Sequence, residues 1–176
     1  KLASISGYLY GSVLVASGHW CGIASVPPGA TPFTEANWSA TTYVGSPQYD
    51  INNIGTVRGV PVVCKPEGIF IYNRSRSLWE NRMPAWEHMP HPDNGRAVVS
   101  LGPSLVIGQG RGGAVIFDGY TIRDFSPYGV ENVPGVDTTS QSFSCFGVGP
   151  DGLLAATTVN NAQTSGAGFQ LQHNRL

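Results

Sequence analysis

Residues 60–73, VPVVCKPEGIFIYN, contain two apolar runs on either side of a short turn. The first run, Val60–Cys64, has no alternation of polar and apolar side chains, and the second is rich in β-branched and aromatic residues. A strand covered on both faces loses the polar alternation of a strand with one face in water. The stretch therefore predicts two strands of a sheet that is packed on both sides, with Glu67 in the hairpin turn between them.

The same pattern recurs along the chain. Each apolar strand follows a strand that ends in a glycine turn, and three of them precede a short glycine-containing connection and a third strand. An outer strand is expected at residues 77–83 and 120–126. The apolar second strands are expected at residues 12–16, 60–64, 104–108 and 152–156, with starts that are 48, 44 and 48 residues apart.

Four antiparallel strands per unit, at a period of roughly 44–48 residues, are typical of β-propeller blades. Stacked blades bury the two faces that a single four-stranded sheet cannot bury alone. We therefore predict an all-β propeller domain or segment over residues 1–176, with blades at about 1–42, 43–90, 91–134 and 135–176. The last unit has no clear outer strand after FQLQHNRL. We therefore expect residues 1–176 to form part of a larger ring or to rely on neighbouring chains. A sandwich or barrel with accidental spacing remains the alternative.

Composition narrows the class of partner. Only 12% of the 176 residues are charged, while Gly and Pro number 23 and 13, which favours many turns and few solvated helices. The net charge is −1, and the 10 basic residues form no cluster, so nucleic acid is not expected as a partner. The chain has no run of 18 apolar residues, and no membrane span is predicted. Cys21, Cys64 and Cys145 form no C-x-x-C pair and are expected to be small core residues.

One stretch matches a nucleotide-binding spacing. In VIGQGRGGAVIF, Gly108, Gly110 and Gly113 have the G-x-G-x-x-G spacing of a dinucleotide fingerprint. That fingerprint needs a helix directly after the glycines, whereas Ala114–Phe117 is a β-branched and aromatic run. Residues 104–117 are therefore predicted to form a β-hairpin whose turn includes Gly110–Gly113, with no nucleotide and no other cofactor.

The densest polar stretch is WEHMPHPDNGR, residues 86–96. His88, His91 and Asp93 are metal-ligand types, but Pro90 and Pro92 are incompatible with a helical ligand pair and favour a loop between two sheets. The exposed contact loop of the protein is expected here. It comprises Trp86, His88, His91, Asp93 and Arg96.

No catalytic centre is predicted. The 11 acidic residues are scattered, with Glu67 and Asp118 in turns and Asp124 beside Arg123 on an outer strand. A glycosidase needs two carboxylates that face one sugar bond, and no such pair is evident. No G-x-S-x-G nucleophile turn occurs either.

The stretch VPVVCKPEGIFIYN, followed by LWENRMP and by HPDNGRAVVSLGPSLVIGQGRGGAVIFDGYTIRDFSP, resembles diverged propeller repeats of tailed-bacteriophage virion proteins. The resemblance covers chiefly residues 50–135. It implies a non-enzymatic structural or attachment module in the tail or on the outer surface of a virion. The implied partners are other virion proteins, copies of itself, or a host surface glycan or receptor.

Two other propeller families are similar at single features only. The pair Gly112-Gly113 is similar to the kelch di-glycine, but the downstream Tyr and Trp of that repeat are not at their spacing. The sialidase Asp-box, S-x-D-x-G-x-T-W, is absent, since FDGYTIRDF lacks its Trp. An extracellular glycan-active propeller enzyme and a sugar-binding lectin remain as alternative functions.

Overall fold

The computed structural model describes residues 1–110, 113–124, 141–149, 152–159 and 167–171, and most of its regular structure is β-strand. The first sheet has the strand order β1-β2-β3-β4, and the second has the order β5-β6-β7-β8. The strands of the first sheet are β1 (Leu2–Ile5), β2 (Tyr8–Val13), β3 (Gly22–Val26) and β4 (Thr42–Tyr43). Those of the second are β5 (Asn53–Val57), β6 (Val60–Lys65), β7 (Gly68–Asn73) and β8 (Leu78–Asn81).

The third sheet repeats this order with four strands, and the fourth sheet has three described strands. The third sheet contains β9 (Val98–Leu101), β10 (Ser104–Gly108), β11 (Ala114–Phe117) and β12 (Ile122–Asp124). The fourth contains β13 (Gln141–Gly149), β14 (Gly152–Val159) and β15 (Ala167–Leu171). The described helices are a 3-10 turn, Glu35–Asn37, and one α-helical turn, α1 (Ala85–His88). The all-β prediction is confirmed, and residues 172–176, where an outer strand of the last unit would lie, are outside the described residues.

Two-residue turns join the first and second strands of the first two sheets. Ile5 pairs with Tyr8 across Ser6-Gly7, and φ is +51° at Ser6 and +81° at Gly7. The second sheet has the same turn at Arg58-Gly59, with φ of +50° and +73°. Positive φ at both central residues is the geometry that suits the twist of a tight hairpin.

This turn corrects the predicted strands of the first unit. A second strand was expected at residues 12–16, but β2 starts at Tyr8 and ends at Val13. The Ser6-Gly7 turn therefore comes earlier in the chain than the glycine at which the turn was predicted. The four sheets otherwise fall within the four predicted units, except that Tyr43 of β4 lies just beyond the first boundary.

The second sheet is buried on both faces, as the apolar run at residues 60–64 predicts. Val62 and Cys64 of β6 belong to a cluster shared with the third sheet, whereas Val63 belongs to a cluster shared with the first sheet. The cluster toward the third sheet contains Val57, Val62, Cys64, Ile69, Ile71, Trp86, Leu105, Ile107, Val115 and Phe117. The cluster toward the first sheet contains Ile5, Ile23, Val44, Ile51, Ile54, Val63 and Phe70.

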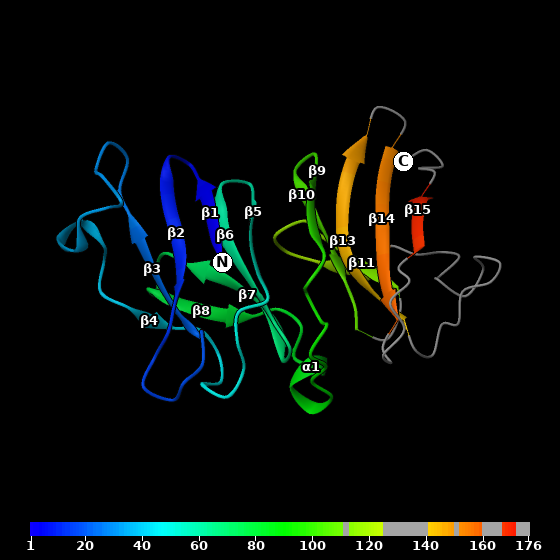
Figure 1. Ribbon diagram of the computed structural model, residues 1–176, viewed down its shortest axis with the longest axis horizontal. Helices are drawn as coiled ribbons and strands as arrows, with labels where there is room; N and C mark the ends of the chain where they lie inside the picture. The colour runs from blue at the N-terminus through cyan, green and yellow to red at the C-terminus, as the bar shows by residue number, and fades with distance from the viewer. Residues whose placement is uncertain (111–112, 125–140, 150–151, 160–166, 172–176) are drawn as a thin grey trace.

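The first strands of successive sheets are neighbours. Strand β5 contacts both β1 and β9, and β9 also contacts β13. Figure 1 shows the first and the fourth sheet toward opposite ends of the long axis, with the second and third between them. Repeated antiparallel sheets arranged in this way fit a β-propeller-like repeat.

The hairpin predicted at residues 104–117 is present. Strand β10 pairs with β11, from Leu105 opposite Phe117 to Gly108 opposite Ala114. Gly113 has a φ of +85°, and strand β11 follows directly, where a nucleotide fingerprint would require a helix. Residues 111 and 112 of the turn lie outside the described residues.

The cysteine prediction is correct for two residues and wrong for the third. Cys21 and Cys64 are buried, but Cys145 is exposed. The register of β13 shifts between Phe143 and Cys145, and such an irregularity changes which face of the sheet a side chain occupies.

No helix among the described residues has the length and apolar character needed to cross a bilayer.

Candidate functional site

The stretch predicted to be an exposed contact loop is partly buried. Trp86 lies on α1, retains only 6% exposure and packs in the cluster between the second and third sheets. The expectation that Trp86 is exposed is therefore wrong. One helical turn, which starts after Pro84 and ends before Pro90, turns the indole inward and leaves His88 in solvent. The prolines in this stretch were expected to exclude a helix, but a single helical turn forms between Pro84 and Pro90.

Asp93 is also buried, at 4% exposure, so the expectation of exposure is wrong for this residue too. Its Oδ1 lies 2.9 Å from Nη1 of Arg96, whose side chain is half-exposed. The backbone N–H of Asp93 donates to Nδ1 of the half-buried His91. Among the described residues, no group of three or more His, Cys, Asp or Glu side chains is placed to hold a metal ion. Whether the loop contacts a partner stays a prediction.

Asn94 connects this loop to two sheets. It is 4% exposed, and its Nδ2 donates to the carbonyl of Pro66 at 2.8 Å. Its Oδ1 accepts from the backbone N–H of Gly110 at 2.9 Å. Asn94 therefore joins the β6–β7 turn of the second sheet to the β10–β11 turn of the third. The Asn-Gly pair in the sequence indicated only a local turn.

Asn52 holds the same loop from another direction. This residue directly precedes β5, and its Nδ2 donates to the carbonyls of Pro92 and Asn94 at 2.8 and 2.7 Å. The next residue, Asn53, donates through Nδ2 to the carbonyl of Arg96 at 2.8 Å. These bonds give three carbonyls of the loop partners within the protein. Much of the stretch predicted to contact ligands is thus a structural connection.

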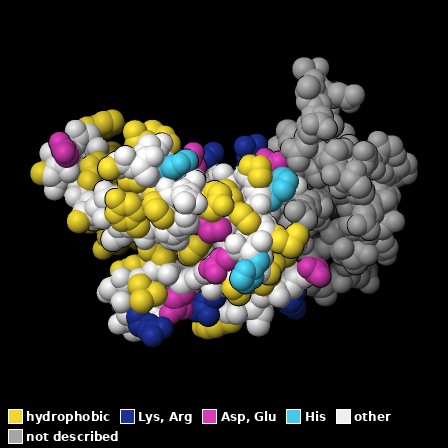
Figure 2. Space-filling view, turned by 90° about the horizontal axis from the view of Figure 1, so that it is seen from below, with side chains coloured by type: hydrophobic (Ala, Val, Ile, Leu, Met, Phe, Trp, Pro, Cys, Tyr) yellow, Lys and Arg dark blue, Asp and Glu magenta, His cyan; other side chains and the backbone are white. Residues whose placement is uncertain are grey.

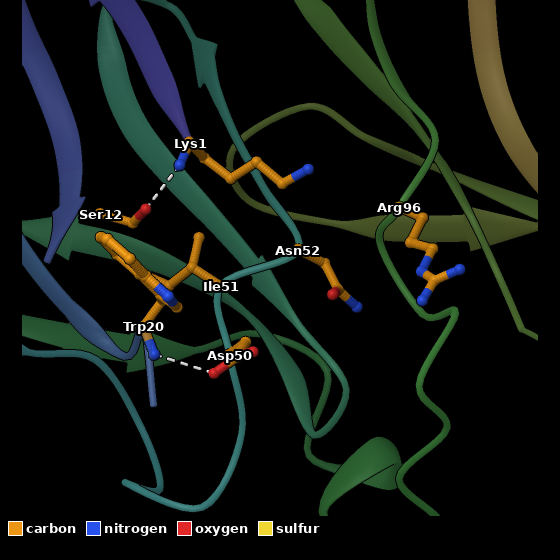
Figure 3. Close-up of a pocket in the computed structure, with 7 residues that line it drawn as sticks. All are labelled: Lys1, Ser12, Trp20, Asp50, Ile51, Asn52 and Arg96. Carbon is orange, nitrogen blue, oxygen red and sulfur yellow. Dashed lines mark hydrogen bonds between the residues drawn. The ribbon is translucent and has the colours of Figure 1, made fainter. Parts of the chain in front are cut away.

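An open pocket of about 630 Å³ lies beside this connection (Figure 3). Its lining comes from the residues just before the first strands of three sheets, together with Ser12 of β2 and Trp20 of the β2–β3 loop. Of the predicted contact residues, only Arg96 lines it. The full lining is Lys1, Ser12, Trp20, Asp50, Ile51, Asn52 and Arg96.

No local pattern in the sequence indicates this pocket, because its residues are distant along the chain. Trp20 is 49% exposed, and its backbone N–H donates to Oδ1 of Asp50 at 2.8 Å. Nδ1 of His19 lies 3.1 Å from the same oxygen. A half-exposed indole beside carboxylate, amide and cationic groups can bind a ligand that has both apolar and polar faces.

The two acidic residues predicted to lie in turns are found there. Glu67 follows β6, and its Oε1 lies 2.8 Å from Nζ of Lys65. Asp118 follows β11 and accepts bonds from the backbone N–H groups of Tyr120 and Thr121. These bonds, together with one from the Thr121 hydroxyl, lower the pKa of Asp118 to about 2. Such a carboxylate remains ionised at neutral pH and is a poor general acid.

Asp124 lies beside Arg123 on β12, the outer strand that was predicted at residues 120–126. A different outer strand, β8, carries Glu80. A hydrogen bond from Asn73 lowers the pKa of Glu80, and a hydrogen bond from Arg76 and the positive charges of Arg82 and Arg76 lower it further.

Comparison of the sequence with protein-family models and with curated proteins finds no match.

Proposed function

We propose that this protein is a non-enzymatic β-propeller module of a bacteriophage virion, which acts in attachment or assembly through its surfaces. Its partners on this proposal are other virion proteins, further copies of the chain, or a receptor or glycan on the host surface. The propeller is supported by the consecutive four-stranded sheets and by the contacts of β5 with both β1 and β9. The virion assignment rests on the resemblance of residues 50–135 to phage propeller repeats.

The observation that carries the non-enzymatic part is the engagement of five carboxylates among the described residues. Glu67 pairs with a buried lysine, Asp93 pairs with Arg96, and Asp118 caps its own turn. Glu80 pairs with Arg76 and Arg82, while Asp50 accepts the backbone N–H of Trp20. Each of these groups is held by a donor that stabilises a turn, a strand or a connection. Acid–base chemistry would instead need carboxylates aimed together at a substrate bond.

The surface supports a contact role. Large apolar side chains remain exposed outside the two clusters, among them Phe33, Tyr43 and Tyr120 at 97%, 57% and 74%. On the face in Figure 2, apolar side chains lie beside scattered acidic, basic and histidine side chains. Aromatic and arginine anchors commonly carry most of the binding energy of an interface. Such a surface suits recognition of another molecule by a few anchors.

The test combines adsorption with hydrolysis. Labelled protein is incubated with a panel of bacterial cells and, separately, with purified surface polysaccharides, whose chain length is followed over time. The proposal expects saturable adsorption to a subset of strains, or assembly with virion proteins, without any shortening of the polysaccharides. Polysaccharide cleavage that Asp50→Asn abolishes would overturn it in favour of a glycan-active enzyme. The absence of both adsorption and assembly would overturn it as well.

A further inference from the structure

The open pocket lies where three sheets begin their first strands. Lys1 precedes β1, Asn52 precedes β5, and Arg96 lies two positions before β9. Because β5 contacts β1 and β9, these starts are brought together by the packing of the sheets. A volume of about 630 Å³ is within the usual range for a small-ligand site.

The indole of Trp20 forms one wall of the pocket, and backbone hydrogen bonds fix the position of this residue. The N–H of Trp20 is bonded to Asp50, and its carbonyl accepts the N–H of Ile51 at 3.0 Å. The backbone of Trp20 is therefore tied on both sides to the segment that leads into β5. Since the indole is nevertheless 49% exposed, it presents a positioned apolar face to solvent. A pyranose ring has a matching apolar face, formed by its axial C–H bonds.

Cationic groups line another part of the pocket. Lys1 takes part in no ion pair among the described residues, and Arg96 uses Nη1 for Asp93 while its side chain stays 53% exposed. Figure 3 shows Asn52 between Trp20 on one side and Arg96 on the other. Lys1 and Arg96 thus give the pocket lining two cationic side chains, and guanidinium groups suit carboxylate and sulfate geometry.

We propose that this pocket binds a saccharide residue that carries a carboxylate or a sulfate. The sugar ring stacks on Trp20, its hydroxyl groups meet Asp50 and Asn52, and its acidic group lies toward Lys1 and Arg96. This inference rests on the proposed attachment function, and it names the ligand class and the site. The adsorption assay and the pocket variants have separate outcomes, so that each part can fail alone.

The experiment is a glycan array followed by titration of the acidic and neutral saccharides that bind. Trp20→Ala removes the stacking face and keeps the backbone bonds, and we expect it to weaken acidic-saccharide binding about tenfold or more. Trp20→Phe retains a ring and should preserve most of the affinity. Lys1→Gln should reduce the preference for acidic over neutral saccharides. Tyr43→Ala, an exposed aromatic that is absent from the pocket lining, is the matched control and should change nothing.

Three outcomes would overturn the inference. One is unchanged binding in a Trp20→Ala protein whose circular dichroism and melting temperature match those of the parent. Another is equal affinity for acidic and neutral saccharides, which would show that the pocket does not recognise a carboxylate or a sulfate. The third is adsorption to cells with no saccharide binding at all, in which case the attachment function stands and the pocket does not serve it.

Discussion

Two connections between successive sheets contact the same turn of the second sheet through different chemistry. The first connection, residues 44–52, runs from the first sheet to the second, and the second connection, residues 82–97, runs from the second to the third. Both are tied to the turn Lys65–Glu67 between β6 and β7. The first connection is held by charged groups, and the second is held by a neutral amide and backbone bonds.

On the first connection, Nζ of Lys65 donates to the carbonyls of Val44 and Ser46 at 2.5 and 2.6 Å. Oε1 of Glu67 pairs with this ammonium and accepts the N–H of Ser46 at 3.0 Å. Lys65 is 0% exposed and Glu67 is 5% exposed. A buried ion pair adds little net stability when intact, but the loss of one partner leaves an uncompensated charge.

On the second connection, the carbonyl of Pro66 accepts from the N–H of His91 and from Nδ2 of Asn94. No full charge is involved in these bonds, so breaking one costs only the desolvation of neutral groups. We therefore expect substitutions at the charged contacts of this turn to cost more stability than substitutions at its neutral contacts.

The largest effect is expected for Lys65→Met. The substitution leaves Glu67 buried without its cation and removes the donor of two carbonyls, so we expect a loss of about 3–5 kcal/mol in the free energy of unfolding. Denaturant unfolding of the parent and the variant measures it. The double variant Lys65→Met/Glu67→Gln should regain part of the loss, because no buried charge then remains. If the double variant is as unstable as Lys65→Met, the unpaired charge of Glu67 is not the cause of the loss.

A smaller effect is expected for Asn94→Ala on the second connection. The carbonyl of Pro66 loses one of its two donors, and the N–H of Gly110 loses its acceptor, at a cost of about 1–3 kcal/mol. The exposed amide Gln48→Ala is the control and should stay within about 0.5 kcal/mol of the parent. Denaturant midpoints compare the three proteins. A loss for Asn94→Ala that equals the loss for Lys65→Met would remove the proposed asymmetry.

Gly110→Ala tests how closely the second connection approaches the β10–β11 turn. A Cβ at residue 110 would lie 1.9 Å from Nδ1 of His91, so the loop must move, and we expect a cost of about 1–3 kcal/mol. Adding His91→Ala removes the ring that is in the way. The double variant should therefore lose less stability than the sum of the two single variants, as a double-mutant cycle would show. Additive losses would mean that this close approach does not limit residue 110.

The smallest effect is expected at Asp118, whose turn after β11 lies outside both connections and serves as a baseline for them. Its pKa is lowered from 3.8 to about 2, chiefly by bonds from the backbone of Thr121 and Tyr120. Its stabilising contribution is therefore fully present above about pH 4 and is lost as the pH falls through about 2. Asp118→Asn should weaken the folded state at neutral pH and flatten this part of the acid-unfolding profile. A variant with an unchanged profile would refute the assignment.

Local patterns predicted much of the fold. The glycine turns before residues 60 and 104, the hairpin at residues 104–117 and the outer strands at 77–83 and 120–126 depend on short-range backbone preferences, and each has its counterpart among the described residues. The first unit was displaced because its sequence has two candidate glycines, and the turn forms at Gly7, whereas Gly11 lies inside β2. The exposure of Trp86 was misjudged because a single helical turn depends on packing against β7 rather than on propensity.

The all-β class, the order of the strands and the double-sided burial of the second sheet are encoded locally, because they follow from strand periodicity and turn chemistry. Which side chains meet depends on how the sheets pack. Lys65 and Ser46, Asn94 and Gly110, and Trp20 and Asp50 are each separated along the chain and are joined by the packing of whole sheets. The pocket belongs to this second group, since no local pattern encodes where the first strands of three sheets converge.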